Sequence, residues 1–198
     1  MNLKILLPLL LVLLVLASTT VQVYALATYE AFNDDSDNYM QSVFGDRLVS
    51  QSFTAESTHA VSAVDLKLMR VGKVESFTIM IQSTMAVELN PGFGIAYIPS
   101  GVVLSSVTVS ARNLPTVAAA WFVYVIPQMT AEEGKVYAVV LSCPARTNSW
   151  NIKRIQWCVN IASLYPGTFS FWLSAESRWA IYQFASAPSI DAQFAIYG

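Results

Sequence analysis

The sequence is poor in the side chains that perform most enzymatic chemistry. Its 198 residues include one histidine, His59, in a polar stretch that is typical of an exposed loop. A Ser-His-Asp or Cys-His site would have to use this residue, and no G-x-S-x-G motif or glycine-rich phosphate loop is present. A glycosidase-type carboxylate pair among the thirteen acidic residues is the remaining catalytic alternative. We therefore expect a protein that is not an enzyme.

Charge is also scarce. Charged residues make up 12% of the chain, about half the share in typical soluble domains. The formal net charge is −2, and the eleven lysines and arginines are scattered along the chain, which argues against nucleic acid as a partner. Low charge favours burial in an assembly, and it suits an extracellular protein equally well.

The N-terminal residues have the layout of a secretory signal peptide. Lys4 precedes an aliphatic run over residues 5–17, which is followed by a polar stretch and by Ala25-Leu26-Ala27. The run is shorter than the roughly 20 residues of a membrane-spanning helix. We expect a helical leader over 1–27, removed on export, with an uncleaved anchor as the alternative. The protein is then extracellular or at the cell surface, and it meets a membrane only through the leader.

The rest of the chain has the pattern of an all-β protein. Apolar and polar residues alternate over 64–68, 77–82 and 155–161, and the apolar run 136–141 is typical of a central strand covered on both faces. Breaker clusters lie at 90–94, 99–101 and 113–115. No helical period occurs outside the leader. We predict an arm or first strand over 28–49 and a single β-sandwich domain over 50–198.

Several motifs in a fixed order carry a resemblance to a known class. They are Gln51-Ser52-Phe53-Thr54-Ala55, the strand from Val64 to Arg70, Tyr165-Pro166-Gly167, and the closing run from Asp191 to Gly198. In this order they resemble extracellular jelly-roll β-sandwich modules, similar to the carbohydrate-binding or galactose-binding-like domains of uncharacterised secreted archaeal, bacterial and viral proteins. The resemblance covers 29–198 and implies a jelly roll. This chain has Lys73-Val74-Glu75 where the class has a Pro-Gly turn, so the geometry of the first hairpin is undecided.

One acidic patch is a candidate metal site. Asp34, Asp35 and Asp37 offer the clustered oxygen ligands that calcium prefers. The EF-hand spacing is not met, because the twelfth position counted from Asn33 is Phe44. The alternative is a solvated polar loop. No other cofactor is expected, since one histidine and two distant cysteines do not make a zinc site.

Aromatic residues in loops are candidate glycan contacts. Trp150 lies in a polar loop, and Tyr165 and Trp179 lie beside turns, where a ring can stack on a sugar. Packing at the rim is the alternative for all three. Trp121, Trp157 and Trp172 lie in apolar runs and are expected in the core.

The two cysteines flank one polar loop. In an exported chain, Cys143 and Cys158 suggest a single disulfide, and two separate buried thiols are the alternative.

Two functions fit these expectations. The first is a non-catalytic structural subunit that self-associates into a filament, pilus-like thread or coat. In this case Tyr29, Ala31 and Phe32 form an arm that adds as a strand to a neighbour's open edge. The alternative for the arm is the sandwich's own first strand. The second function is a monomeric glycan-binding adhesion module.

Overall fold

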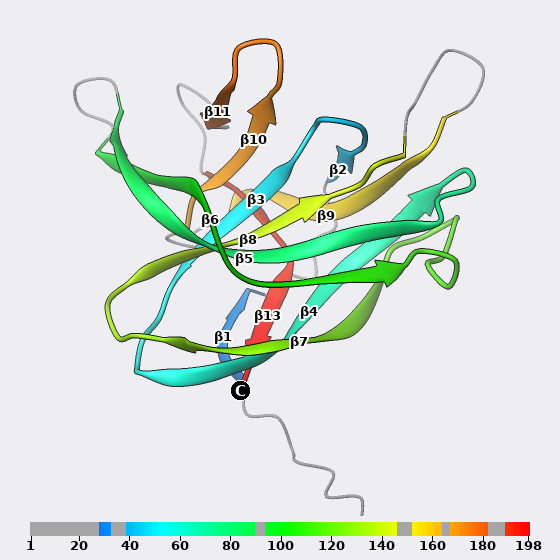
Figure 1. Ribbon diagram of the computed structural model, residues 1–198. Helices are drawn as coiled ribbons and strands as arrows, with labels where there is room; N and C mark the ends of the chain where they lie inside the picture. The colour runs from blue at the N-terminus through cyan, green and yellow to red at the C-terminus, as the bar shows by residue number, and fades with distance from the viewer. Residues whose placement is uncertain (1–27, 33–38, 90–93, 146–151, 164–166, 182–188) are drawn as a thin grey trace, which may run out of the picture.

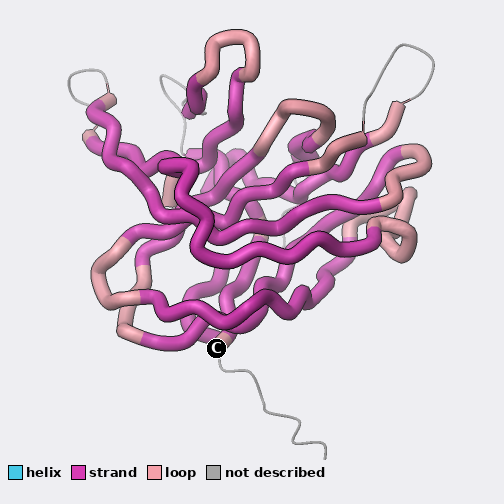
Figure 2. Tube along the Cα trace, in the orientation of Figure 1, coloured by secondary structure: helices cyan, strands magenta, loops and turns pink. Residues whose placement is uncertain are grey.

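The computed structural model describes residues 28–32, 39–89, 94–145, 152–163, 167–181 and 189–198. Within these ranges every regular element is a β-strand, and the strands form two antiparallel sheets (Figure 1; Figure 2). The predicted all-β class is therefore confirmed, and the arrangement is that of a sandwich. No helix of these ranges is long and apolar enough to cross a membrane. The predicted leader, residues 1–27, lies outside the described residues.

The described part of the chain contains thirteen strands, which are divided between the two sheets. The first sheet contains β1 (Thr28–Phe32), β2 (Tyr39–Val43), β4 (His59–Val71), β7 (Ala120–Ala131), β9 (Arg154–Ser163), β12 (Ser189–Ala192) and β13 (Phe194–Tyr197). The second sheet contains β3 (Val49–Thr54), β5 (Ser76–Glu88), β6 (Ile95–Ser110), β8 (Val136–Ser142), β10 (Phe169–Leu173) and β11 (Arg178–Ile181).

Eight consecutive strands pair in a nested series. β5 pairs with β6, β4 with β7, β3 with β8 and β2 with β9, all antiparallel. Successive pairs of the series lie in alternate sheets, so the chain crosses from one sheet to the other between β2 and β3, β3 and β4, and β4 and β5. The turn at Lys73-Val74-Glu75, where the sequence left the hairpin geometry undecided, is thus a crossing between the two sheets.

The core lies between the two sheets and follows the alternation of the sequence. Val64, Leu66 and Leu68 of β4 belong to it, whereas Asp65 and Lys67 point to the outer face. β8 is buried on both faces, as its apolar run predicted. Burial of these aliphatic and aromatic side chains contributes the main favourable term, at about 25 cal/mol per Å² of apolar surface.

The chain's last strands fill a fork in the first sheet. β4 pairs with β9 over 68–71 but with β13 over 63–66, and β9 continues along β12. Gln193 lies at the point where β4 and β9 separate. Its backbone N–H donates to the Cys158 carbonyl at 2.9 Å, and its carbonyl accepts from the Trp157 indole at 2.8 Å. The strands β12 and β13 are thereby held between their neighbours.

A buried glutamine joins the two sheets on the side of β3 and β12. Gln51 is fully buried, and its amide nitrogen donates to the Asp191 carboxylate at 2.9 Å. Its amide oxygen accepts from the Ala192 N–H at 2.8 Å. Buried polar groups require such partners, because losing one leaves the other desolvated and unpaired. Gln51 therefore ties β3 of one sheet to β12 of the other.

The predicted disulfide is wrong, since Cys143 and Cys158 are both buried and are not bonded to each other. Cys143 follows β8 and packs into the core, where burial raises its pKa. Cys158 lies on β9 between Trp157 and Val159, which both face the core. Because neighbouring residues of a strand point to opposite faces, the Cys158 thiol is directed away from the core and from Cys143.

Two other expectations are corrected. His59 is not an exposed loop residue, because it begins β4, is 8% exposed, and its Nδ1 lies 2.8 Å from the Ser57 carbonyl. The cluster at 99–101 does not end a strand, because β6 runs through it. Gly101 has a φ of +87°, and the β5–β6 register shifts nearby. An edge strand tolerates a proline and a bulge that a central strand would not.

The role of Gln51 predicts a stability loss. The variant Gln51→Met keeps the side-chain volume but removes both hydrogen bonds that cross between the sheets. We expect the free energy of unfolding to fall by about 2–4 kcal/mol, measured by urea denaturation. Gln128→Met, at an exposed position of β7, is the matched control and should change stability by less than about 0.5 kcal/mol. Similar losses in both variants would contradict the bridging role.

Candidate functional site

One side of the sandwich is formed by the edge strands of both sheets. β6 is the last strand of the second sheet, and β7 has β4 as its strand partner in the first. The two strands contact each other along the front of the molecule in Figure 1. The Ser105 hydroxyl donates to the Pro127 carbonyl at 2.6 Å and links them. We call this side, β6 with β7, the open side.

The open side is almost free of charge. Arg112, between the two strands, is the only charged residue of the sequence between Glu88 and Glu132. Several large apolar side chains on the strands are exposed instead, namely Val102, Val103 and Leu104 on β6 and Val123 and Val125 on β7. An edge of this kind presents backbone donors and acceptors beside apolar side chains, which is the surface that a further strand or sheet can join.

The usual protections of an edge are few here. Natural edge strands are commonly short or carry lysine, proline or a bulge. β6 spans sixteen residues without a lysine, and its proline and glycine, Pro99 and Gly101, lie in its first half. Pro127 removes one donor from β7. The second half of β6 and the first half of β7 therefore remain available for pairing.

Charged residues of β4 lie behind the open side. Asp65 is opposite Val123 of β7, and burial raises the pKa of its carboxyl. Burial, with the charge of Asp65 as a smaller cause, raises the pKa of the Tyr124 hydroxyl. The Lys67 amine lies 5.9 Å from the centre of the Trp121 ring, which is a cation–π distance. Trp121 is half-buried, and the prediction that it lies in the core is wrong. These groups flank β7 without placing a charge on it.

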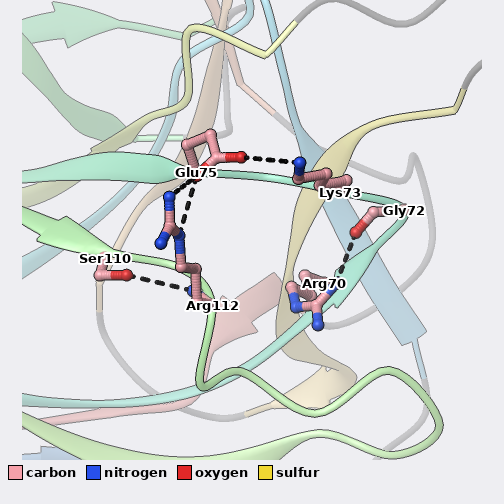
Figure 3. A network of polar contacts seen from close by, with 6 residues as sticks. All are labelled: Arg70, Gly72, Lys73, Glu75, Ser110 and Arg112. Atoms are coloured by element: carbon pink, nitrogen blue, oxygen red, sulfur yellow. Dashed lines mark hydrogen bonds and ion pairs between the residues drawn. The ribbon is translucent and has the colours of Figure 1, made fainter.

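A second surface feature is a small basic hollow at the end of β4. It has a volume of about 330 Å³ and is lined by Arg70, Lys73, Val74, Glu75 and Arg112. Figure 3 shows how the polar side chains lie. Arg112 donates through Nε and Nη2 to one Glu75 oxygen, at 2.9 and 2.5 Å, and the Lys73 amine lies 3.6 Å from the other. Arg70 Nη1 donates to the Gly72 carbonyl at 2.7 Å.

Glu75 organises the charges of this hollow. The hydrogen bond and charge of Arg112, aided by Lys73, lower the pKa of Glu75, so it is ionised at neutral pH. Its side chain is largely exposed, and the ion pairs add little to stability. Three cations and one carboxylate line the hollow, and only Arg112 and Lys73 pair with Glu75, which leaves a local excess of positive charge.

The aromatic residues predicted to contact glycans are only partly described. Trp179 lies on β11 directly opposite Trp172 of β10, and their rings meet edge to face with centroids 5.7 Å apart. Both are half-buried, so Trp172 is not in the core as predicted, whereas Trp157 is fully buried. Trp150 and Tyr165 lie outside the described residues.

The predicted arm pairs within its own chain. Residues 28–32 form β1, which runs antiparallel to β13, so Tyr29, Ala31 and Phe32 belong to the sandwich's own strand in this single copy. The acidic patch with Asp34, Asp35 and Asp37 lies outside the described residues. Within the described residues, no group of three or more His, Cys, Asp or Glu side chains could hold a metal ion.

Neither surface was identified from the sequence, although one of them left a signal there. The charge-free segment between Glu88 and Glu132 marks the open side, but hydrophobic alternation alone does not show which strands become edges. Arg70 and Arg112 come together only because the chain crosses between the sheets. No family model and no curated protein matches this chain.

Gly72 is predicted to be essential for the turn beside the basic hollow. Its φ is +70°, and an added Cβ would lie 2.0 Å from the Ile152 carbonyl oxygen. Gly134 has a similar φ of +75° and open space around it. We expect Gly134→Ala to lower the free energy of unfolding by about 1–2 kcal/mol, through backbone strain alone.

Gly72→Ala should cost clearly more, about 3 kcal/mol or greater, because strain and steric overlap add. Thermal or urea unfolding of the two variants measures the difference. Equal losses would show that the close approach to Ile152 is not a constraint.

Proposed function

We propose that this chain is a non-catalytic, extracellular structural subunit that self-assembles into a surface filament, pilus-like thread or coat. The open side carries the proposal, since it offers two neighbouring edge strands with exposed apolar side chains and no charge of their own. The occupant is a second copy of the same chain. When two such surfaces meet, no charged group is buried, so the contact avoids the free-energy cost of desolvating ions.

The topology is compatible with this role. We propose that the sandwich is a jelly roll with strands added at its other side, and the orders β2–β9–β4–β7 and β3–β8–β5–β6 of the nested series support this proposal. Jelly rolls serve as coat and lectin domains, so the fold is compatible with both candidate functions and selects neither. We propose that the chain is exported and that the leader over residues 1–27 is then cleaved. The layout of this segment and the low overall charge of the chain support export.

Assembly through the open side would extend a sheet from one copy to the next. The edge of β6 offers main-chain hydrogen bonds, while Val102, Val103 and Leu104 supply apolar contact on both faces of the strand. A contact that repeats without closing produces a thread, whereas a two-fold contact ends as a dimer.

A charge placed on the open side should prevent assembly. In Val103→Lys, a lysine takes the place of a side chain that is 47% exposed on β6, which is a natural protection of edge strands. We expect association to weaken at least about tenfold, with unchanged circular dichroism, as measured by sedimentation velocity and electron microscopy.

The matched control is Val117→Lys, at a residue that is 91% exposed between β6 and β7. It should assemble as the unmodified protein does. Undiminished assembly of Val103→Lys would exclude the open side, and a protein that stays monomeric at high concentration would exclude self-assembly altogether.

Glycan binding by a monomer is the second candidate function. Its support is the pair of half-buried rings, Trp172 and Trp179, on the hairpin of β10 and β11 (Figure 1). Aromatic faces at a surface can stack on sugars. Trp179→Ala should then abolish retention on a glycan array while Trp121→Ala, at a half-buried tryptophan of the other sheet, leaves it intact. Equal retention by all three proteins would exclude this hairpin as a sugar site.

A further inference from the structure

We propose that the basic hollow of Arg70, Lys73 and Arg112 binds an oxyanion of the carboxylate or sulfate class, carried by an acidic polysaccharide. This inference is independent of self-assembly, because none of these three residues lies on β6 or β7. It assigns a ligand chemistry to the part of the surface where cations gather.

The hollow is held in place by backbone contacts between segments distant in sequence. Ala111 N–H donates to the Glu75 carbonyl, and Arg70 N–H donates to the Pro115 carbonyl, each at 2.9 Å. Val74 is buried in the core and gives the hollow an apolar floor. The cationic side chains therefore rise from fixed positions on the end of β4, the following turn and the segment after β6. A volume of about 330 Å³ has room for a sulfate or carboxylate group and part of the sugar that bears it.

The charge of the hollow is opposite to that of the whole protein. Three cationic side chains and one carboxylate line it, whereas the chain as a whole has a formal net charge of −2. Lys73 and Arg112 are 85% and 74% exposed, so both can turn toward a ligand without unfolding the turn. Guanidinium groups suit this chemistry because their planar donors match the oxygens of carboxylate and sulfate.

Arg70 is held at the wall of the hollow by its own turn. Its Nη1 is used by the Gly72 carbonyl, which fixes the guanidinium at the wall of the hollow. Its Nε is shielded from solvent and has no hydrogen-bond partner within the described part of the chain. A shielded donor without an acceptor is unfavourable. The rest of the Arg70 side chain lines the hollow, so its positive charge lies beside an oxyanion bound there.

Glu75 sets the strength of the site and does not block it. The carboxylate holds Arg112 and Lys73 beside each other, and its negative charge opposes a bound anion. Replacing it by the isosteric glutamine removes one negative charge from the hollow. Anion affinity should then rise about threefold or more at low ionic strength, and the gain should shrink as salt is added.

The test uses three probes with the full mature protein. Inorganic sulfate tests the oxyanion chemistry, dextran sulfate tests the polysaccharide source, and neutral dextran of equal length is the control ligand. Arginine Nε–Hε signals in NMR report on Arg70 and Arg112 directly, and isothermal titration gives the affinities. We expect sulfate to shift both signals, dextran sulfate to bind more tightly, and neutral dextran to have no effect.

Variants separate a specific site from general attraction. Arg70→Gln and Arg112→Gln should each weaken dextran sulfate binding at least about fivefold, and Glu75→Gln should strengthen it. Arg178→Gln is the matched control, because Arg178 is an exposed arginine paired with Glu176 on the distant β10–β11 hairpin. Equal losses in all three arginine variants, or unshifted Arg70 and Arg112 signals, would overturn the site. Sulfate binding without any gain for dextran sulfate would overturn the polysaccharide source.

Discussion

The nested pairing of β2 to β9 is the constraint on which the rest of the structure depends. Once β5 pairs with β6, each further pair adds outside the previous one, and alternate pairs fall into opposite sheets. The core is the space enclosed by this single long hairpin as it rolls up. Because the pairs join segments far apart in sequence, the fold is rich in non-local contacts, a property that slows folding. The same nesting leaves β6 and β7 as neighbouring edges, so the open side is a consequence of the topology.

The opposite side of the sandwich is treated differently. There the chain adds β10 and β11 to the second sheet and β1, β12 and β13 to the first. Gln51 then joins the two sheets through Asp191 and Ala192. On the open side the Ser105 hydroxyl donates to the Pro127 carbonyl. The added strands and the buried hydrogen bonds of Gln51 therefore lie on one side of the sandwich. This contrast makes the open side a reasonable place for a second copy to bind.

The sequence allowed the strands to be predicted wherever side-chain alternation is strict. β4, β5 and β8 followed from their patterns, because one face or both are buried and the period of two is unbroken. The predictions failed where a long-range arrangement decides. Cys143 and Cys158 flank one loop but face different ways, and residues 99–101 look like a break although β6 passes through them at an edge. Neither surface could be located, since each combines segments that meet only after the chain crosses between the sheets.

The fork in the first sheet determines the order in which its strand pairs can form during synthesis. Leu66 pairs with Phe194, so part of β4 has to wait for a strand that is synthesised long after it. The same holds for β9, whose hydrogen bond to Gln193 forms only when the end of β12 is present. A chain that folds while it leaves the ribosome would expose both strand edges during this interval, at the risk of pairing with another nascent chain. A chain kept unfolded until β13 has emerged would avoid that interval, and its sandwich would close in one step.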